Sequence, residues 1–70
     1  MVIYMIITIN GQELDFDKEL SIQDFLDKKN IKPDSVVIEL NQTIIPSDKY
    51  CTTWLSQKDK LEILRFVGGG

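Results

Sequence analysis

Alternating hydrophobic and polar positions predict that the chain begins with a β-hairpin. Residues 2–10 are rich in β-branched side chains and form a strand pattern whose apolar face carries Ile3, Met5, Ile7 and Ile9. Asn10-Gly11 follows, and this pair favours a type I′ turn because both residues tolerate positive φ. Residues 13–18 alternate again, with Leu14 and Phe16 between acidic residues, so we expect a second strand at an edge of the sheet.

One amphipathic helix is predicted after the hairpin. Ser21, followed three residues later by Asp24, resembles a capping box and starts a helix that we expect to reach about residue 29. Its apolar stripe has i, i+3, i+4 spacing and consists of Ile22, Phe25 and Leu26. Asn30 is a suitable left-handed stop. Residues 32–34 are expected to form a connecting loop.

The second half of the chain carries three further apolar segments. Residues 36–40 predict a strand, and Asn41-Gln42 can turn the chain into a short strand at residues 43–45, which Pro46 ends. Residues 47–55 have no clear period and can hold one helical turn, in which Tyr50 and Trp54 are expected to cover the end of the core. Residues 61–67 predict the last strand.

The order of these elements indicates an α+β fold. A last strand that lies beside the first and parallel to it closes the core beneath a single helix, which is the ubiquitin-like β-grasp arrangement. We expect a mixed sheet of four to five strands with one main helix on one face. Residues 1–70 form a single domain in this interpretation, and residues 66–70 form a flexible C-terminal glycine tail.

Composition narrows the possible functions. The net charge of −3, with no basic cluster beyond Lys28-Lys29, argues against nucleic-acid binding. The chain has no histidine and one cysteine, so neither a zinc cluster nor an internal disulfide is expected. Cys51 has no histidine or second cysteine to activate it and is interpreted as a passive thiol. A reduced cysteine and the absence of a long apolar run fit a cytoplasmic protein that is not embedded in a membrane.

The final residues, Phe66-Val67-Gly68-Gly69-Gly70, carry the strongest functional signal. Glycine makes up about 7% of ordinary sequences, so three in succession at a chain end are unusual. They indicate a slender terminus presented to an enzyme, although a frayed end or an expression remnant gives the same pattern. No lysine or helix follows them, which argues against a phosphate-binding loop. The Gly70 carboxylate is the remaining candidate: adenylation by ATP would activate it, and a sulfur nucleophile would convert it to a thiocarboxylate.

The last predicted strand is apolar on both faces. Leu61, Ile63 and Val67 share one face, whereas Leu64 and Phe66 share the other. Because one helix covers only one face of a sheet, Leu64 and Phe66 can form an exposed patch that docks a partner. The alternative is that loops or the region of Trp54 cover them.

The order of motifs resembles the ThiS family of sulfur carrier proteins in thiamine biosynthesis. The resemblance covers nearly the whole chain and rests on Met5-Ile-Ile-Thr-Ile-Asn-Gly11, Val37-Ile-Glu-Leu-Asn41, Ile45-Pro46, Asp59 and Leu61-Glu-Ile-Leu-Arg-Phe-Val-Gly-Gly-Gly70. The family's usual start aligns with Met5. The sequence therefore leaves open whether the native start is Met1 or Met5. Gly69 and Gly70 match the family's terminal Gly-Gly, whereas position 68 is more variable.

This resemblance implies a protein co-substrate rather than an enzyme. An E1-like adenylyltransferase of the ThiF class would adenylate Gly70, and a cysteine desulfurase or another donor would supply sulfur. A thiazole synthase of the ThiG class would receive that sulfur. The chain itself would bind no cofactor, because ATP and magnesium belong to the activating partner. Gly68, Val67, Phe66 and Leu64 are our expected partner-binding residues.

Two alternatives remain open from the sequence. The small subunit of molybdopterin synthase shares the fold and the tail and also carries a thiocarboxylate. A non-catalytic ubiquitin-like interaction or modifier module belongs to a different functional class. In that class, attachment to lysine would yield adducts much larger than a sulfur atom.

Overall fold

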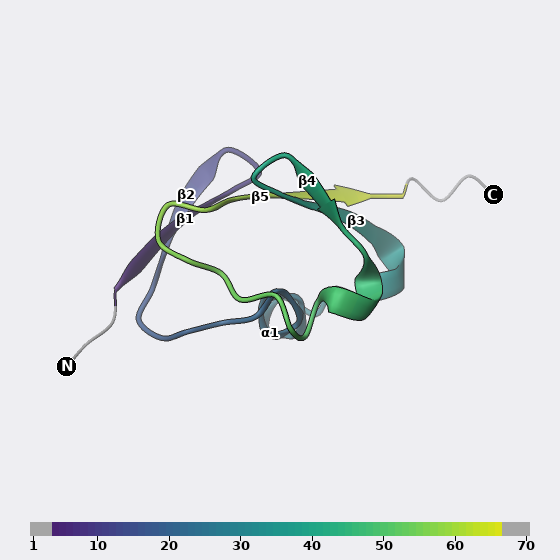
Figure 1. Ribbon diagram of the computed structural model, residues 1–70, viewed down its shortest axis with the longest axis horizontal. Helices are drawn as coiled ribbons and strands as arrows, with labels where there is room; N and C mark the ends of the chain where they lie inside the picture. Colours follow the sequence, from purple (N-terminus) through teal and green to yellow (C-terminus); the bar gives the residue numbers. More distant parts are fainter. Residues whose placement is uncertain (1–3, 67–70) are drawn as a thin grey trace.

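The computed structural model describes residues 4–66 and consists of one mixed sheet packed on one helix (Figure 1). The strands are β1 (Met5–Ile9), β2 (Gln12–Phe16), β3 (Val36–Leu40), β4 (Thr43–Ile45) and β5 (Lys60–Arg65). The helical segments are α1 (Ile22–Lys28) and two short 3₁₀ turns, η1 (Pro33–Ser35) and η2 (Ser47–Lys49). The expectations for Ile3 and for residues 67–70 lie outside the described part.

The strand order β2-β1-β5-β3-β4 confirms the predicted fold class. The last strand, β5, lies at the centre of the sheet, parallel to β1 and antiparallel to β3. The second strand, β2, lies at an edge, as its alternation predicts. The final strand of the chain therefore has a neighbour on each side, and both neighbours belong to hairpins formed earlier in the sequence.

Both hairpin turns use the left-handed backbone conformation. Asn10 and Gly11 have φ values of 51° and 82°, which confirms the predicted Asn-Gly turn. Asn41 and Gln42 have φ values of 51° and 71°, so the turn between β3 and β4 follows the same pattern. The stop after the helix is also confirmed, since Asn30 has φ 57°.

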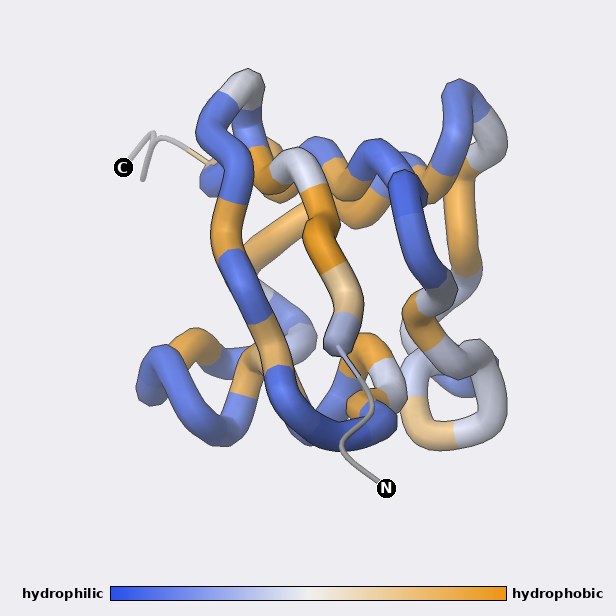
Figure 2. The backbone as a smooth tube through the Cα atoms, turned by 90° about the vertical axis from the view of Figure 1, so that its left-hand side faces the viewer, coloured by the Kyte–Doolittle hydropathy of each residue, from blue (hydrophilic) through white to orange (hydrophobic). Residues whose placement is uncertain are grey.

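The core lies between the sheet and α1 (Figure 1). Ile22, Phe25 and Leu26 of the predicted helix stripe are buried against the inner face of the sheet. That inner face is made of alternate strand residues, including Met5, Ile7, Phe16, Ile38, Leu61 and Ile63. Figure 2 shows the hydrophobic stretches of the strands alternating with hydrophilic ones, while hydrophilic residues occupy the turns.

The expected bounds of three strands are wrong because strands extend only as far as their partners. The second strand ends at Phe16, since the opposite β1 begins at its pairing partner Met5. For the same reason Tyr4 is outside β1, and the strand is shorter than residues 2–10. The last strand begins at Lys60 and ends at Arg65, so Phe66 follows the strand.

The expected role of Trp54 is also wrong. Tyr50 is buried at 2% exposure and does cover the core, but Trp54 is 55% exposed. The i, i+4 spacing places two residues on one face only within a continuous helix, and the single helical turn predicted in this region ends at Lys49. Residues 32–34 were expected to form a connecting loop; instead Lys32 is the N-cap of the 3₁₀ turn η1, and Pro33 and Asp34 lie within it.

Candidate functional site

The candidate site begins where the central strand β5 ends. Phe66 follows β5 directly, and its backbone N–H donates to the carbonyl of Ser35 at 3.2 Å. This bond continues the pairing of β5 with β3 for one residue beyond the strand. The expected site residues Val67, Gly68, Gly69 and Gly70 lie outside the described part of the chain.

Leu64 and Phe66 are exposed, with exposed fractions of 51% and 63%. The alternation Leu61 buried, Glu62 exposed, Ile63 buried, Leu64 exposed places Leu64 on the face of the sheet away from α1, which we call the outer face. No helix lies above that face in the described residues (Figure 1). The alternative in which loops or the Trp54 region cover these two side chains is therefore wrong.

Strand pairing adds two apolar residues to this surface that the sequence did not identify. Val37 lies directly opposite Leu64, and Ile44 lies opposite Glu39 with 64% of its surface exposed. Side chains opposite one another in antiparallel strands share a face. Alternation within residues 43–45 could have placed Ile44 outward, but only the register shows that it lies on the same face as Leu64. We refer to Val37, Ile44, Leu64 and Phe66 as the outer apolar patch.

The rest of the outer face is mainly acidic. Glu62 lies opposite Glu39 across the β3–β5 pair. Glu13 and Asp15 of β2 lie opposite Thr8 and Ile6, two outward-facing residues of β1. Lys60 is the basic residue in this array, opposite Thr8. The outer face thus combines apolar side chains near the end of β5 with carboxylates across the sheet, which suits a partner surface with apolar and basic groups.

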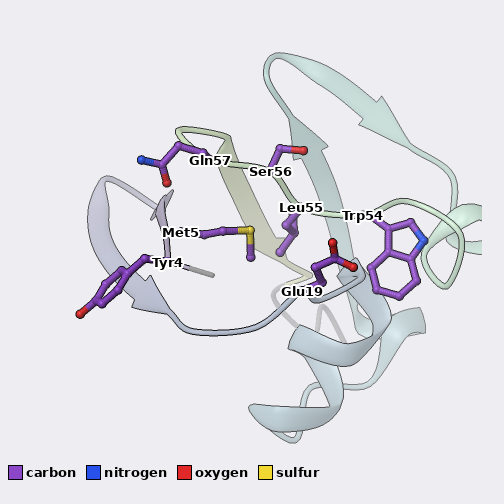
Figure 3. Close-up of a pocket in the computed structure, with 7 residues that line it drawn as sticks. All are labelled: Tyr4, Met5, Glu19, Trp54, Leu55, Ser56 and Gln57. Atoms are coloured by element: carbon purple, nitrogen blue, oxygen red, sulfur yellow. The ribbon is translucent and has the colours of Figure 1, made fainter. Parts of the chain in front are cut away.

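Trp54 belongs to a different surface. Its backbone forms an isolated bridge with Ser21 at the start of α1. It lines a pocket together with Tyr4, Met5, Glu19, Leu55, Ser56 and Gln57. Figure 3 shows Met5 pointing toward Leu55, with Tyr4 turned away from both and Trp54 lying beyond Glu19. This pocket lies beside the first turn of the helix and includes none of the expected site residues.

The remaining candidate groups of the described residues lie apart from the end of the sheet's last strand or are absent. Among residues 4–66, no group of three or more histidine, cysteine, aspartate and glutamate side chains could hold a metal ion. Cys51 is an exposed free thiol. Burial raises the pKa of the Tyr50 phenol, which lies in the core away from the end of β5. No helix in this part of the chain is long and apolar enough to cross a membrane.

Comparison with known proteins identifies the family. The ThiS family model matches residues 6–70. The sulfur carrier protein ThiS of Bacillus subtilis is 35% identical over 63 residues, which are 89% of this chain and 96% of that protein. A thiazole synthase of Paramagnetospirillum magneticum is 33% identical over 66 residues, which cover 94% of this chain but 20% of that larger protein.

A solved structure agrees with these sequence matches. The crystal structure of the thiamine biosynthesis protein ThiS from Geobacter metallireducens superimposes with a TM-score of 0.80 at 28% identity. The superposition covers 94% of this chain and all of that one. The match over residues 6–70, the relatives and the shared β-grasp fold show that this chain belongs to the ThiS family of sulfur carrier proteins in thiamine biosynthesis.

Proposed function

We propose that the chain carries sulfur as a thiocarboxylate on Gly70. In the first step, a carboxylate oxygen of Gly70 attacks the α-phosphorus of ATP, forming an acyl-adenylate and releasing pyrophosphate. Sulfide, released from the donor's persulfide by a thiol reductant, then attacks the activated carbonyl carbon; AMP leaves with the former carboxylate oxygen, and the thiocarboxylate remains. In this proposal both steps take place in partner active sites, and the chain contributes its terminal carboxylate and a docking surface.

The observation that supports this proposal best is the junction between the outer apolar patch and the glycine tail. Leu64 and Phe66 are exposed at the end of the central strand, and Val67-Gly68-Gly69-Gly70 follow immediately in the sequence. Four extended residues reach about 13 Å. A partner that binds the patch therefore has the Gly70 carboxylate within reach of an active site a short distance away.

The first proposed partner is an E1-like adenylyltransferase of the ThiF class, which would supply ATP and magnesium. Gly69 would pass through its narrow channel, where a Cβ atom would obstruct entry. Leu64, Phe66, Val67 and Gly68 would contact the enzyme around that channel. A cysteine desulfurase or another donor would provide the sulfur atom.

The second proposed partner is a thiazole synthase of the ThiG class. The support is the relative from Paramagnetospirillum magneticum, a protein named thiazole synthase in which the matched 66 residues form a minor part. One polypeptide thus contains a segment similar to this chain and bears the name of the enzyme proposed to accept the sulfur. This favours thiazole formation over molybdenum cofactor synthesis as the destination of the sulfur.

Intact mass after co-expression with a ThiF-class enzyme and a sulfur donor tests the chemistry. We expect a gain of about 16 Da, the replacement of one oxygen by sulfur. A variant lacking Gly69 and Gly70 should show no gain, and thermal melting of both chains checks that the truncated variant is folded. An unchanged mass in the full chain, together with thiamine-free growth supported by the truncated variant, would rule the proposal out. Adducts larger by a whole protein would indicate a modifier instead.

A further inference from the structure

We propose that Asn10 is a positioning residue that holds the C-terminal half of β5 in place, and with it Leu64 and Phe66 of the outer apolar patch. The consequence for partner binding rests on the proposed function. The structural claim does not, because it concerns hydrogen bonds among described residues.

The need for such a residue follows from the short contact between β1 and β5. Their ladder pairs Thr8 with Lys60 and Ile9 with Leu61, and Asn10 then enters the turn toward β2. The backbone N–H of Asn10 still donates to the carbonyl of Leu61 at 2.9 Å. Beyond that point, β1 has no further residue to pair with the rest of β5.

The side chain of Asn10 continues the ladder where the backbone stops. Its Oδ1 accepts a hydrogen bond from the N–H of Ile63 at 2.7 Å, and its Nδ2 donates to the carbonyl of Ile63 at 3.3 Å. A carboxamide carries one acceptor and a donor side by side, as a peptide group does. The amide of Asn10 thus replaces the next residue of β1, and both partly buried bonds go to one residue of β5.

Asn41 performs the same task at the opposite end of β5. Its backbone N–H donates to the carbonyl of Lys60 at 2.8 Å, and its Oδ1 accepts from the N–H of Lys60 at 2.9 Å. Its Nδ2 donates to Oδ1 of Asp59 at 3.0 Å. Asn10 and Asn41 both occupy the first left-handed position of a hairpin turn, with the same φ of 51°. They differ in which end of the central strand they hold.

The end held by Asn10 is the one that leads to the tail. After Ile63, the chain passes through Leu64 and Arg65 to Phe66, which bonds to Ser35 on the β3 side. On the β1 side of β5, Asn10 bonds to Ile63, just before Leu64 and Arg65. If that side loosens, a smaller fraction of molecules presents Leu64 and Phe66 in the arrangement that a partner binds. The apparent affinity of a partner that binds both falls in proportion to that fraction.

The chain offers a matched pair of variants for the test, Asn10→Gly and Asn41→Gly. Glycine keeps the positive φ of each turn and removes one carboxamide. Amide hydrogen exchange should become roughly tenfold faster at Ile63 in Asn10→Gly and at Lys60 in Asn41→Gly, each without the reciprocal change. Asn10→Asp should leave the Ile63 amide better protected than Asn10→Gly does, because a carboxylate oxygen still accepts the Ile63 N–H and only the donor to the Ile63 carbonyl is lost.

The kinetic test uses pyrophosphate release by a ThiF-class enzyme with ATP. We expect Asn10→Gly to raise the KM for the carrier several-fold with kcat nearly unchanged, while Asn41→Gly keeps the wild-type KM at a similar melting temperature. Equal KM values for the two variants, or an Ile63 amide that exchanges at the wild-type rate in Asn10→Gly, would overturn the inference. If the enzyme releases no pyrophosphate with the wild-type chain, the proposed function is wrong. The hydrogen-exchange experiment still tests the role of Asn10 in that case.

Discussion

At the scale of single residues, the sequence did not distinguish the buried Tyr50 from the exposed Trp54. Both are large aromatic residues four positions apart, and the sequence treats them alike. The fold buries Tyr50 among the core residues and leaves Trp54 exposed beside the helix start. The difference depends on the path of residues 46–59, which have no repeating pattern to predict it. Local signals that need only neighbouring residues were more reliable, such as Asn10-Gly11 and the Ser21–Asp24 capping box.

Tyr50 gives a prediction for alkaline pH. Burial raises its pKa above the usual value near 10, so folding favours the neutral phenol. This contribution to stability is complete below about pH 10 and decreases as pH rises through the folded-state pKa, because unfolding then allows the phenol to ionise. Urea unfolding between about pH 8 and 11 should show a steeper loss of stability for the wild type than for Tyr50→Phe.

Tyr4→Phe is the control for that comparison, because Tyr4 is exposed. It removes one hydroxyl group from an exposed site and so controls for the substitution itself. The assignment to Tyr50 is contradicted if Tyr50→Phe and the wild type lose stability in parallel over this range. Comparison of slopes rather than of absolute stabilities removes any effect of the hydroxyl on packing.

At the scale of elements, α1 depends on groups outside itself. A helix of seven residues is too short to be stable alone. Its first N–H groups find partners in the segment that follows β4: Ile22 donates to Thr53 at 3.0 Å and Gln23 donates to Tyr50 at 3.1 Å. The capping box supplies the next bond, from the Asp24 N–H to Oγ of Ser21 at 3.0 Å. The sequence predicted the cap and the apolar stripe, but not the carbonyls contributed by Tyr50 and Thr53.

The cap provides the prediction at this scale. Ser21→Ala should lower the free energy of unfolding by about 1 kcal/mol, the usual cost of losing an N-cap side chain. Ser21 is buried, so water cannot readily replace its hydroxyl. Ser35→Ala is the matched control: its Oγ donates to the Lys32 carbonyl in an exposed turn, and its loss should cost about 0.5 kcal/mol or less. Urea unfolding of both variants measures the difference between them. Equal losses of unfolding free energy would show that the cap stabilises the protein no more than an exposed turn hydroxyl does.

At the scale of the whole molecule, residues 4–66 form a five-stranded sheet with a short helix on one face, and none of these residues covers the other face. The element order predicted this arrangement, and the parallel pairing of β1 and β5 confirms it. Whether Leu64 and Phe66 lay on an open face remained undecided from the sequence, because the segment between β4 and β5 could have crossed either side. It passes beneath the sheet, on the side of α1 (Figure 1). Val37 and Ile44 join the outer apolar patch only through strand register, which no local pattern contains.

The exposed position of Phe66 separates binding from stability and so allows a direct test of the outer apolar patch. Phe66→Asp should change the free energy of unfolding by about 0.5 kcal/mol or less, since the ring is 63% exposed. It should weaken binding to a ThiF-class enzyme at least tenfold, because an apolar contact is lost and a carboxylate is placed where the partner is expected to present apolar surface.

Trp54→Asp is the matched control for this experiment. It removes an aromatic ring of similar exposure and adds the same charge, but on the side of the molecule near the start of α1. Calorimetric titration and thermal melting of both variants separate the two effects. Wild-type affinity in Trp54→Asp with weak binding in Phe66→Asp would locate the docking surface on the outer face. Equal loss of affinity in both would mean that added negative charge, rather than the patch, governs the association.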